Sequence, residues 1–204
     1  MTDLRILRDL RELRVLLAHP HDGDGDELLR QLRRIGCQVH HAWPPPPARN
    51  DQFDVVFFLV EHASANVSDS RYDDTGLTRI AVVNAESPLS LRALMDARVH
   101  AVIMKPIRPI GILTNLVLGR SLQTYESRLI SKVTKLEETM KSQRLIARAT
   151  RIIMARECLS EDEAYGLLRR QAMKKRVSMA SIAEALTKAE ALLEGLRKVP
   201  ETGR

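Results

Sequence analysis

A run of positively charged residues near the carboxyl end has the composition of a polyanion-binding surface. Ala164, Leu167, Leu168, Ala172 and Met173 recur there at the spacing of one helix face, which predicts an amphipathic helix. The side chains that could contact phosphates or bases are placed on or beside the rest of this helix: Tyr165, Arg169, Arg170, Lys174, Lys175 and Arg176. A helix with a buried face and a cationic face can pack in a bundle and dock on a polyanion. Taken alone, such a run is equally typical of a solvated helix face.

The charge distribution along the chain favours polyanion binding. Residues 1–140 contain 18 Lys and Arg and 18 Asp and Glu, whereas residues 141–204 contain 14 Lys and Arg and 8 Asp and Glu. The formal net charge of +6 therefore comes from the last 64 residues. Aromatic residues make up only 3% of the chain, so folds that bind single strands by stacking bases on aromatic side chains are disfavoured.

The segments around the cationic run predict two more short helices. Ser160 and Glu163 form a capping box at the start of the cationic helix. Residues 144–157 before it have an apolar side, and a third helical pattern follows from the predicted N-cap Ser178. Helices this short are marginal alone, so we expect residues 144–196 to form a three-helix bundle.

These residues carry a resemblance to a known family. The pattern Ala149, Ile153-Met154, Ser160 to Ala164, Leu168-Arg169, Ala172-Met173 and Ile182-Ala183 resembles the ANTAR domain, the three-helix RNA-binding module of bacterial transcription antiterminators. Many members carry Lys where this chain has Thr150, which Arg148 and Arg151 flank. We therefore predict RNA binding by Arg148, Arg151, Tyr165, Arg169, Arg170, Lys174, Lys175 and Arg176.

The first half of the chain has the pattern of an α/β domain. Short apolar segments predict strands at 13–18, 37–42, 53–60, 79–84 and 99–104, and helices are expected at 26–35 and 90–97. Alternating strands and helices predict a parallel sheet covered on both faces. Their order resembles a response-regulator receiver domain with a flavodoxin-like fold.

The residues that would carry receiver chemistry are missing. At the aligned positions, His19 and Pro20 replace the acidic pair, Leu59 replaces the phosphate-accepting aspartate and Asn84 replaces the hydroxyl residue; only Lys105 matches. Without these carboxylates we expect neither a Mg²⁺ site nor a phosphoryl acceptor. We interpret residues 1–108 as a pseudo-receiver, with no metal, no cofactor and no enzymatic activity.

A zinc enzyme is the alternative for the first loop. His19-Pro20-His21-Asp22 is similar to a motif of zinc-dependent deacetylases, but a catalytic zinc needs three protein ligands and the expected downstream histidine pair is missing. The two cysteines, Cys37 and Cys158, lie far apart and form no metal or redox motif, so we expect both to be reduced core residues.

Residues 109–143 predict one long helix between the two domains. Leu129, Val133, Leu136 and Met140 follow a 3–4 spacing, which predicts a short coiled coil and a homodimer. The expected organisation is a pseudo-receiver at 1–108, the coiled-coil helix at 109–143, the ANTAR domain at 144–196 and a tail at 197–204.

The turn Trp43 to Pro47, together with the missing aspartate and the ANTAR pattern, extends the resemblance to nearly the whole chain. It resembles the AmiR/NasT-type antiterminators, and among them the regulators of aliphatic amidase operons. The resemblance implies that a homodimer binds hairpins in a leader mRNA and prevents the terminator hairpin from forming. It also implies control by a ligand-sensing negative regulator of the AmiC type, which would sequester the antiterminator.

Two other functions remain open on the sequence. Residues 178–186 look like the first helix of a helix-turn-helix, as in a DNA-binding transcription factor, but the next residues continue the helix without a turn. A protein-binding adaptor would have no affinity for nucleic acid. The sequence has no run of eighteen apolar residues and no signal-peptide core, so we expect a cytoplasmic protein without a membrane partner.

Overall fold

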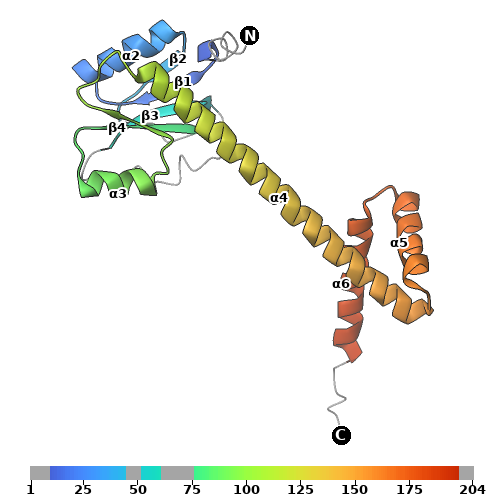
Figure 1. The fold of residues 1–204 in the computed structure, drawn as a ribbon. Coiled ribbons are helices and arrows are strands. Elements are labelled where there is room, and N and C mark those ends of the chain that lie inside the picture. The colour runs from blue at the N-terminus through green and yellow to red at the C-terminus, as the bar shows by residue number, and fades with distance from the viewer. Residues whose placement is uncertain (1–9, 45–51, 61–75, 198–204) are drawn as a thin grey trace. The chain divides into compact units, whose positions relative to one another are not determined.

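The computed structural model describes residues 10–44, 52–60 and 76–197, and the chain divides into two compact units, Met1–Ile130 and Ser131–Arg204 (Figure 1). Residues 45–47 of the proline-rich turn and the predicted tail beyond residue 197 lie outside the described residues.

The first unit is built on a five-stranded parallel sheet. Its strands are β1 (Arg14–Ala18), β2 (Gln38–His41), β3 (Val55–Val60), β4 (Thr78–Val83) and β5 (Ala101–Met104). They lie in the order β2-β1-β3-β4-β5, and every neighbouring pair is parallel. This is the flavodoxin-like strand order, which confirms the fold expected for the first half.

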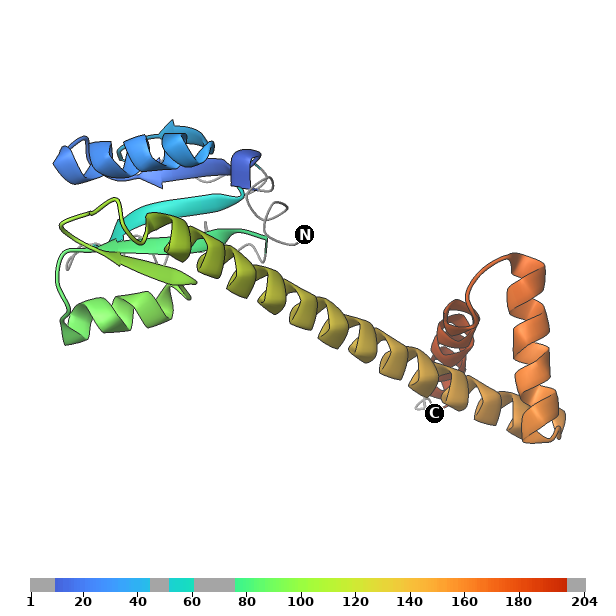
Figure 2. The ribbon, with the colours of Figure 1, turned by 45° about the horizontal axis from the view of Figure 1, so that its top comes forward.

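Helices cover both faces of this sheet, which explains why β3 is apolar throughout and β4 is apolar from Ile80 to Val83. All six residues of β3 and all six of β4 are buried. Helix α2 (Gly23–Ile35) and the start of α4 pack on one face, and α3 (Pro88–Asp96) packs on the other (Figure 2). Alternate strand residues point to opposite faces, so Phe57 belongs to the first of these cores and Phe58 to the second.

Local sequence sets the ends of α2. The Asp22 side chain accepts a hydrogen bond from the Gly25 N–H, and Asp22 is the N-cap. The helix therefore begins at Gly23, three residues before the predicted start. At the other end Gly36 takes a left-handed conformation with φ of 103°, which glycine adopts without a steric penalty.

Helix α4 (Ile112–Glu157) contains 46 residues and is about 69 Å long at 1.5 Å per residue. It combines the predicted long helix with the first helix of the predicted bundle in one uninterrupted element. Its first turns pack on the sheet through the buried Ile112 and Leu116. Gly119 permits a close approach, because a Cβ at this position would lie 3.4 Å from the side chains of Ala101 and Thr78.

The second unit contains the end of α4 with α5 (Glu161–Lys175) and α6 (Met179–Arg197). The predicted capping box at the start of α5 is present: the Ser160 hydroxyl accepts from the Glu163 N–H, and the Glu163 carboxylate accepts from the Ser160 N–H. The core consists of five buried residues, of which three are alanines that let the helices approach closely: Ala149, Ile153, Ala164, Leu168 and Ala183.

Two sequence predictions about buried side chains are wrong in this unit. Met173 is 69% exposed, because it is five residues after the buried Leu168 and so points away from the core, whereas Ala172, four residues after Leu168, is buried. Cys158 is also exposed: it directly follows α4 with a left-handed φ of 53°, outside the bundle core. Cys37 is buried as predicted, and burial raises the pKa of its thiol to about 11.

Candidate nucleic-acid interface

The predicted cations of α5 lie on its solvent-exposed surface in two rows. Tyr165 is 46% exposed, and with Arg169 and Met173 it forms one row at spacings of four residues. Arg170 and Lys174 form the next row around the helix, and the Arg170 guanidinium folds back to within 3.4 Å of where a Cβ on Gly166 would lie. Both rows are accessible to a ligand.

Charges separate along α5. Its first turn carries three acidic residues, whereas Lys174 and Lys175 are in its last turn and Arg176 is the left-handed C-cap. This arrangement agrees with the helix dipole, because carboxylates are favoured at the amino end and cations at the carboxyl end. The carboxyl end of α5 is therefore its electropositive end.

On α4 the position at which this chain departs from the ANTAR pattern is directed inward. Thr150 is 4% exposed and donates its hydroxyl to the carbonyl of Ile146 at 2.9 Å. The flanking Arg148 and Arg151 are exposed, and the Nε of Arg151 donates to the carbonyl of Ala147. The first bundle helix therefore presents arginines to solvent on either side of a buried threonine.

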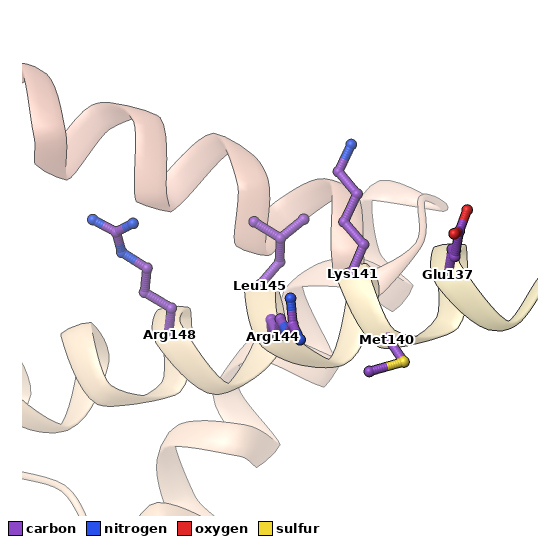
Figure 3. A pocket seen from close by; sticks show the side chains of 6 residues that line it. All are labelled: Glu137, Met140, Lys141, Arg144, Leu145 and Arg148. Carbon is purple, nitrogen blue, oxygen red and sulfur yellow. The ribbon is translucent and has the colours of Figure 1, made fainter. Parts of the chain in front are cut away.

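Arg148 also lines a hollow along α4 that sequence reasoning missed. The hollow has a volume of about 460 Å³ and is lined by Glu137, Met140, Lys141, Arg144, Leu145 and Arg148 (Figure 3). Lys141 and Arg148 extend to the same side of the helix, on either side of Leu145 (Figure 3). The spacing of Lys141, Arg144 and Arg148 is visible in the sequence, but the predicted domain boundary at residue 144 divided them.

Other cations of the second unit are paired with carboxylates. Arg156 forms an ion pair with Glu190, and Lys188 lies 2.8 Å from Glu184. The hydrogen bond and charge of Lys188 lower the pKa of Glu184, and Lys141 adds a weaker electrostatic effect. No ion pair within 4.0 Å is found, among the described residues, for the hollow's three cations or for those of α5. Their charge is available to an external anion.

The residues predicted to form a dimer interface are exposed on one side of α4. Leu129 is 43% exposed, Val133 53%, Leu136 64% and Met140 52%. The exposed stripe also extends toward the start of the helix through Leu118, Leu122 and Tyr125. These seven residues repeat every eleven positions (118, 129 and 140; 122 and 133; 125 and 136), a spacing that places them on one face of an α-helix.

The positions aligned with a receiver's phosphorylation site lie at the carboxyl ends of the strands. His19 is fully buried after β1, with Pro20 next to it, and Leu59 is 5% exposed within β3. Asn84 is exposed after β4, and Lys105 is half-buried after β5. A buried leucine therefore occupies the acceptor position.

The structure also brings two carboxylates to this place. The Nζ of Lys105 lies 3.4 Å from Asp22 Oδ2 and 3.6 Å from Asp24 Oδ2. Asp24 Oδ1 also accepts a hydrogen bond of 2.7 Å from the Ile107 N–H. Sequence alignment missed Asp22 and Asp24 because they belong to the N-cap and first turn of α2, which starts earlier than predicted. Among the described residues no group of three His, Cys, Asp or Glu could hold a metal ion.

Burial determines the direction of the pKa shift at His19, whereas hydrogen bonds and neighbouring charges determine it at Asp22. Burial lowers the pKa of His19, whose Nδ1 donates to the Pro20 carbonyl at 2.9 Å and whose Nε2 has no partner among the described residues. Burial alone would raise the pKa of Asp22, but the Gly25 N–H, His19 and Lys105 together lower it. The lowered pKa favours the neutral form of His19, which lies beside the ion pairs of Lys105 with Asp22 and Asp24.

Comparison with known proteins agrees with both halves of this architecture. The family model described as AmiR, N-terminal, matches residues 13–120, and the ANTAR domain model matches residues 134–186. An aliphatic amidase regulator from Pseudomonas aeruginosa is 34% identical over 184 residues, which cover 89% of this chain and 94% of that protein. The chain belongs to the AmiR family of ANTAR-domain proteins.

Two solved structures are similar to about half of this AmiR-family chain. A CheY-like response regulator receiver domain from Methanospirillum hungatei has a TM-score of 0.45 and 18% identity, and covers 56% of this chain and 98% of its own. A response regulator receiver protein from Burkholderia phymatum has a TM-score of 0.42 and 18% identity, and covers 53% and 96%. Within the described residues, no helix is long and apolar enough to cross a membrane.

Proposed function

We propose that this AmiR-family chain is an RNA-binding transcription antitermination regulator. It binds hairpins in a nascent leader mRNA and prevents the terminator hairpin from forming. The observation that carries the proposal is the group of exposed cations on the ANTAR-matched helices, which make no ion pair within the described part of the chain. Arg and Lys contribute affinity through phosphates, and hairpin loops and shape contribute specificity.

We also propose the operon and the mode of control. The amidase regulator of Pseudomonas aeruginosa suggests that the target is an aliphatic amidase operon. Control by a ligand-sensing partner of the AmiC type, which sequesters the regulator, suits a receiver-like unit with a leucine at the acceptor position. In this proposal the protein is a cytoplasmic homodimer without enzymatic activity, and the apolar stripe of α4 forms the dimer contact.

A DNA-binding transcription factor is the second candidate. A helix-turn-helix reading of residues 178–186 needs a turn after Leu186, but α6 continues without interruption to Arg197. The geometry at this position therefore favours RNA over a recognition helix for the DNA major groove.

The test is binding of the full chain to the amidase leader RNA and to a DNA duplex of the same sequence, combined with in vitro transcription through the terminator. We expect saturable binding to RNA, much weaker binding to DNA and increased read-through. Binding to DNA alone would favour the transcription factor, and binding to neither would favour a protein-binding adaptor.

A further inference from the structure

The hollow along α4 is lined by three exposed cations that form no ion pair among the described residues. Lys141, Arg144 and Arg148 are exposed and line one volume, whereas Arg156 and Lys188 in the same unit are held in ion pairs. Cations gathered around a hollow, with no carboxylate within ion-pair distance among the described residues, create a local positive potential that salt weakens but no neighbouring carboxylate cancels. The hollow therefore has the electrostatics of an anion site.

The walls of the hollow are apolar between the cations. Leu145 lies between Lys141 and Arg148 on the same side of the helix (Figure 3). From residue 141 to residue 148 the helix rises about 10 Å, at 1.5 Å per residue. This combination of an apolar side chain and separated cations fits a nucleotide better than a bare phosphate, because a base can lie on Leu145 while phosphates contact the cations. Arginine guanidinium groups also stack on unpaired bases.

We propose that the α4 hollow binds an unpaired nucleotide of the RNA hairpin loop, with Lys141, Arg144 and Arg148 contacting its flanking phosphates. This inference rests on the proposed RNA-binding function and assigns it a site that is separate from the predicted cations of α5. The volume of about 460 Å³ is large enough for a nucleotide-sized ligand. Glu137, at the amino-terminal end of the hollow, carries its only negative charge and limits the site on that side.

The decisive measurement is RNA affinity as a function of salt for the variant Lys141→Gln/Arg144→Gln/Arg148→Gln, with the amidase leader RNA as probe. Gln keeps a flexible stem and good helix propensity while it removes the charge. If each cation contacts a phosphate of an unpaired strand, the salt slope should fall in magnitude by about 0.7 for each, or about 2 in total. Affinity should fall about 10- to 100-fold, as expected for three solvent-exposed charge contacts.

The matched control is Lys132→Gln/Lys135→Gln, which removes two exposed cations from the same helix outside the hollow. We expect this control to retain nearly all of the affinity, and the circular dichroism and oligomeric state of both variants to equal those of the wild type. Abasic substitution of the hairpin-loop nucleotides should weaken the wild type strongly and the triple variant only slightly, because the two changes remove the same contact.

Three results would overturn the proposal. The triple variant could bind with unchanged affinity and salt slope, or the control could lose as much as the triple variant, which would indicate general attraction in place of a site. Equal binding of a DNA duplex, with equal losses in the variants, would assign the hollow to DNA. If the wild-type chain binds no leader RNA at all, the proposed function itself fails; unchanged binding by the triple variant leaves that function intact and rejects the hollow alone.

Discussion

The apolar stripe of α4 leads to a quantitative prediction about dimerisation. Replacing Val133 and Leu136 with Asp should convert the dimer to monomers at concentrations where the wild type is dimeric. Both side chains are more than half exposed in the single chain, so neither contributes much to its own folding. The substitutions should therefore affect association far more than the stability of the bundle.

The magnitude follows from the exposed fractions. Full burial of a Val, Leu or Met side chain is worth about 1.5–3 kcal/mol, so burying the exposed half of one yields about 1 kcal/mol. Removing two such residues from each of two copies costs about 4 kcal/mol, which corresponds to roughly a thousandfold higher dissociation constant. The four carboxylates placed in the interface add to this loss, because buried charges without partners are strongly disfavoured.

Sedimentation equilibrium over a wide range of protein concentration provides the measurement. The matched control is Ser131→Asp/Thr134→Asp, which adds the same charge to exposed positions on the opposite side of α4. We expect the control to dimerise like the wild type. A wild type that stays monomeric with and without RNA, or a control that dissociates as readily as the Val133 and Leu136 variant, would refute this reasoning.

The remaining predictions concern α5, phosphorylation and pH. Replacing Arg170 or Lys174 with Ala should weaken RNA binding to all hairpins alike and lower the magnitude of the salt slope by up to about one unit each. Tyr165→Ala should instead cost about 1–3 kcal/mol of RNA-binding free energy, and only with the preferred loop sequence. Unchanged salt slopes would exclude α5 from the interface. Incubation with acetyl phosphate and Mg²⁺ should leave the protein mass unchanged, and an adduct lost on mutating one specific aspartate would contradict this. Burial lowers the pKa of both His19 and His100, although Glu126 opposes this at His100. Below a pH of about 6.5 the unfolded chain therefore binds protons that the folded chain does not. The free energy of unfolding of the first unit should therefore fall as pH drops below about 6.5, by up to about 1.4 kcal/mol per pH unit for each histidine, and His19→Gln should flatten the dependence in urea titrations.

Local patterns in the sequence predicted the strands and most of the helices of this protein, although not every boundary. The continuous apolar run of β3 and the shorter run from Ile80 to Val83 in β4 identified these strands, because strands buried on both faces consist mostly of apolar residues. Ser160 and Glu163 predicted the start of α5, and Gly36 predicted the end of α2. The concentration of net positive charge in residues 141–204 is likewise a property of the sequence, because it follows from the number of charged residues alone.

Only the tertiary structure decided which side chains meet. Lys105 contacts Asp22 although 83 residues separate them, because parallel strands bring the loops after β1 and β5 to the same end of the sheet. The inward direction of Thr150 and the exposure of Met173 depend on how three helices pack around small residues. Helix periodicity predicts which side chains share a face of a helix, but whether that face is buried depends on the neighbouring helix. Contacts between residues far apart in the chain cannot be predicted from a local pattern.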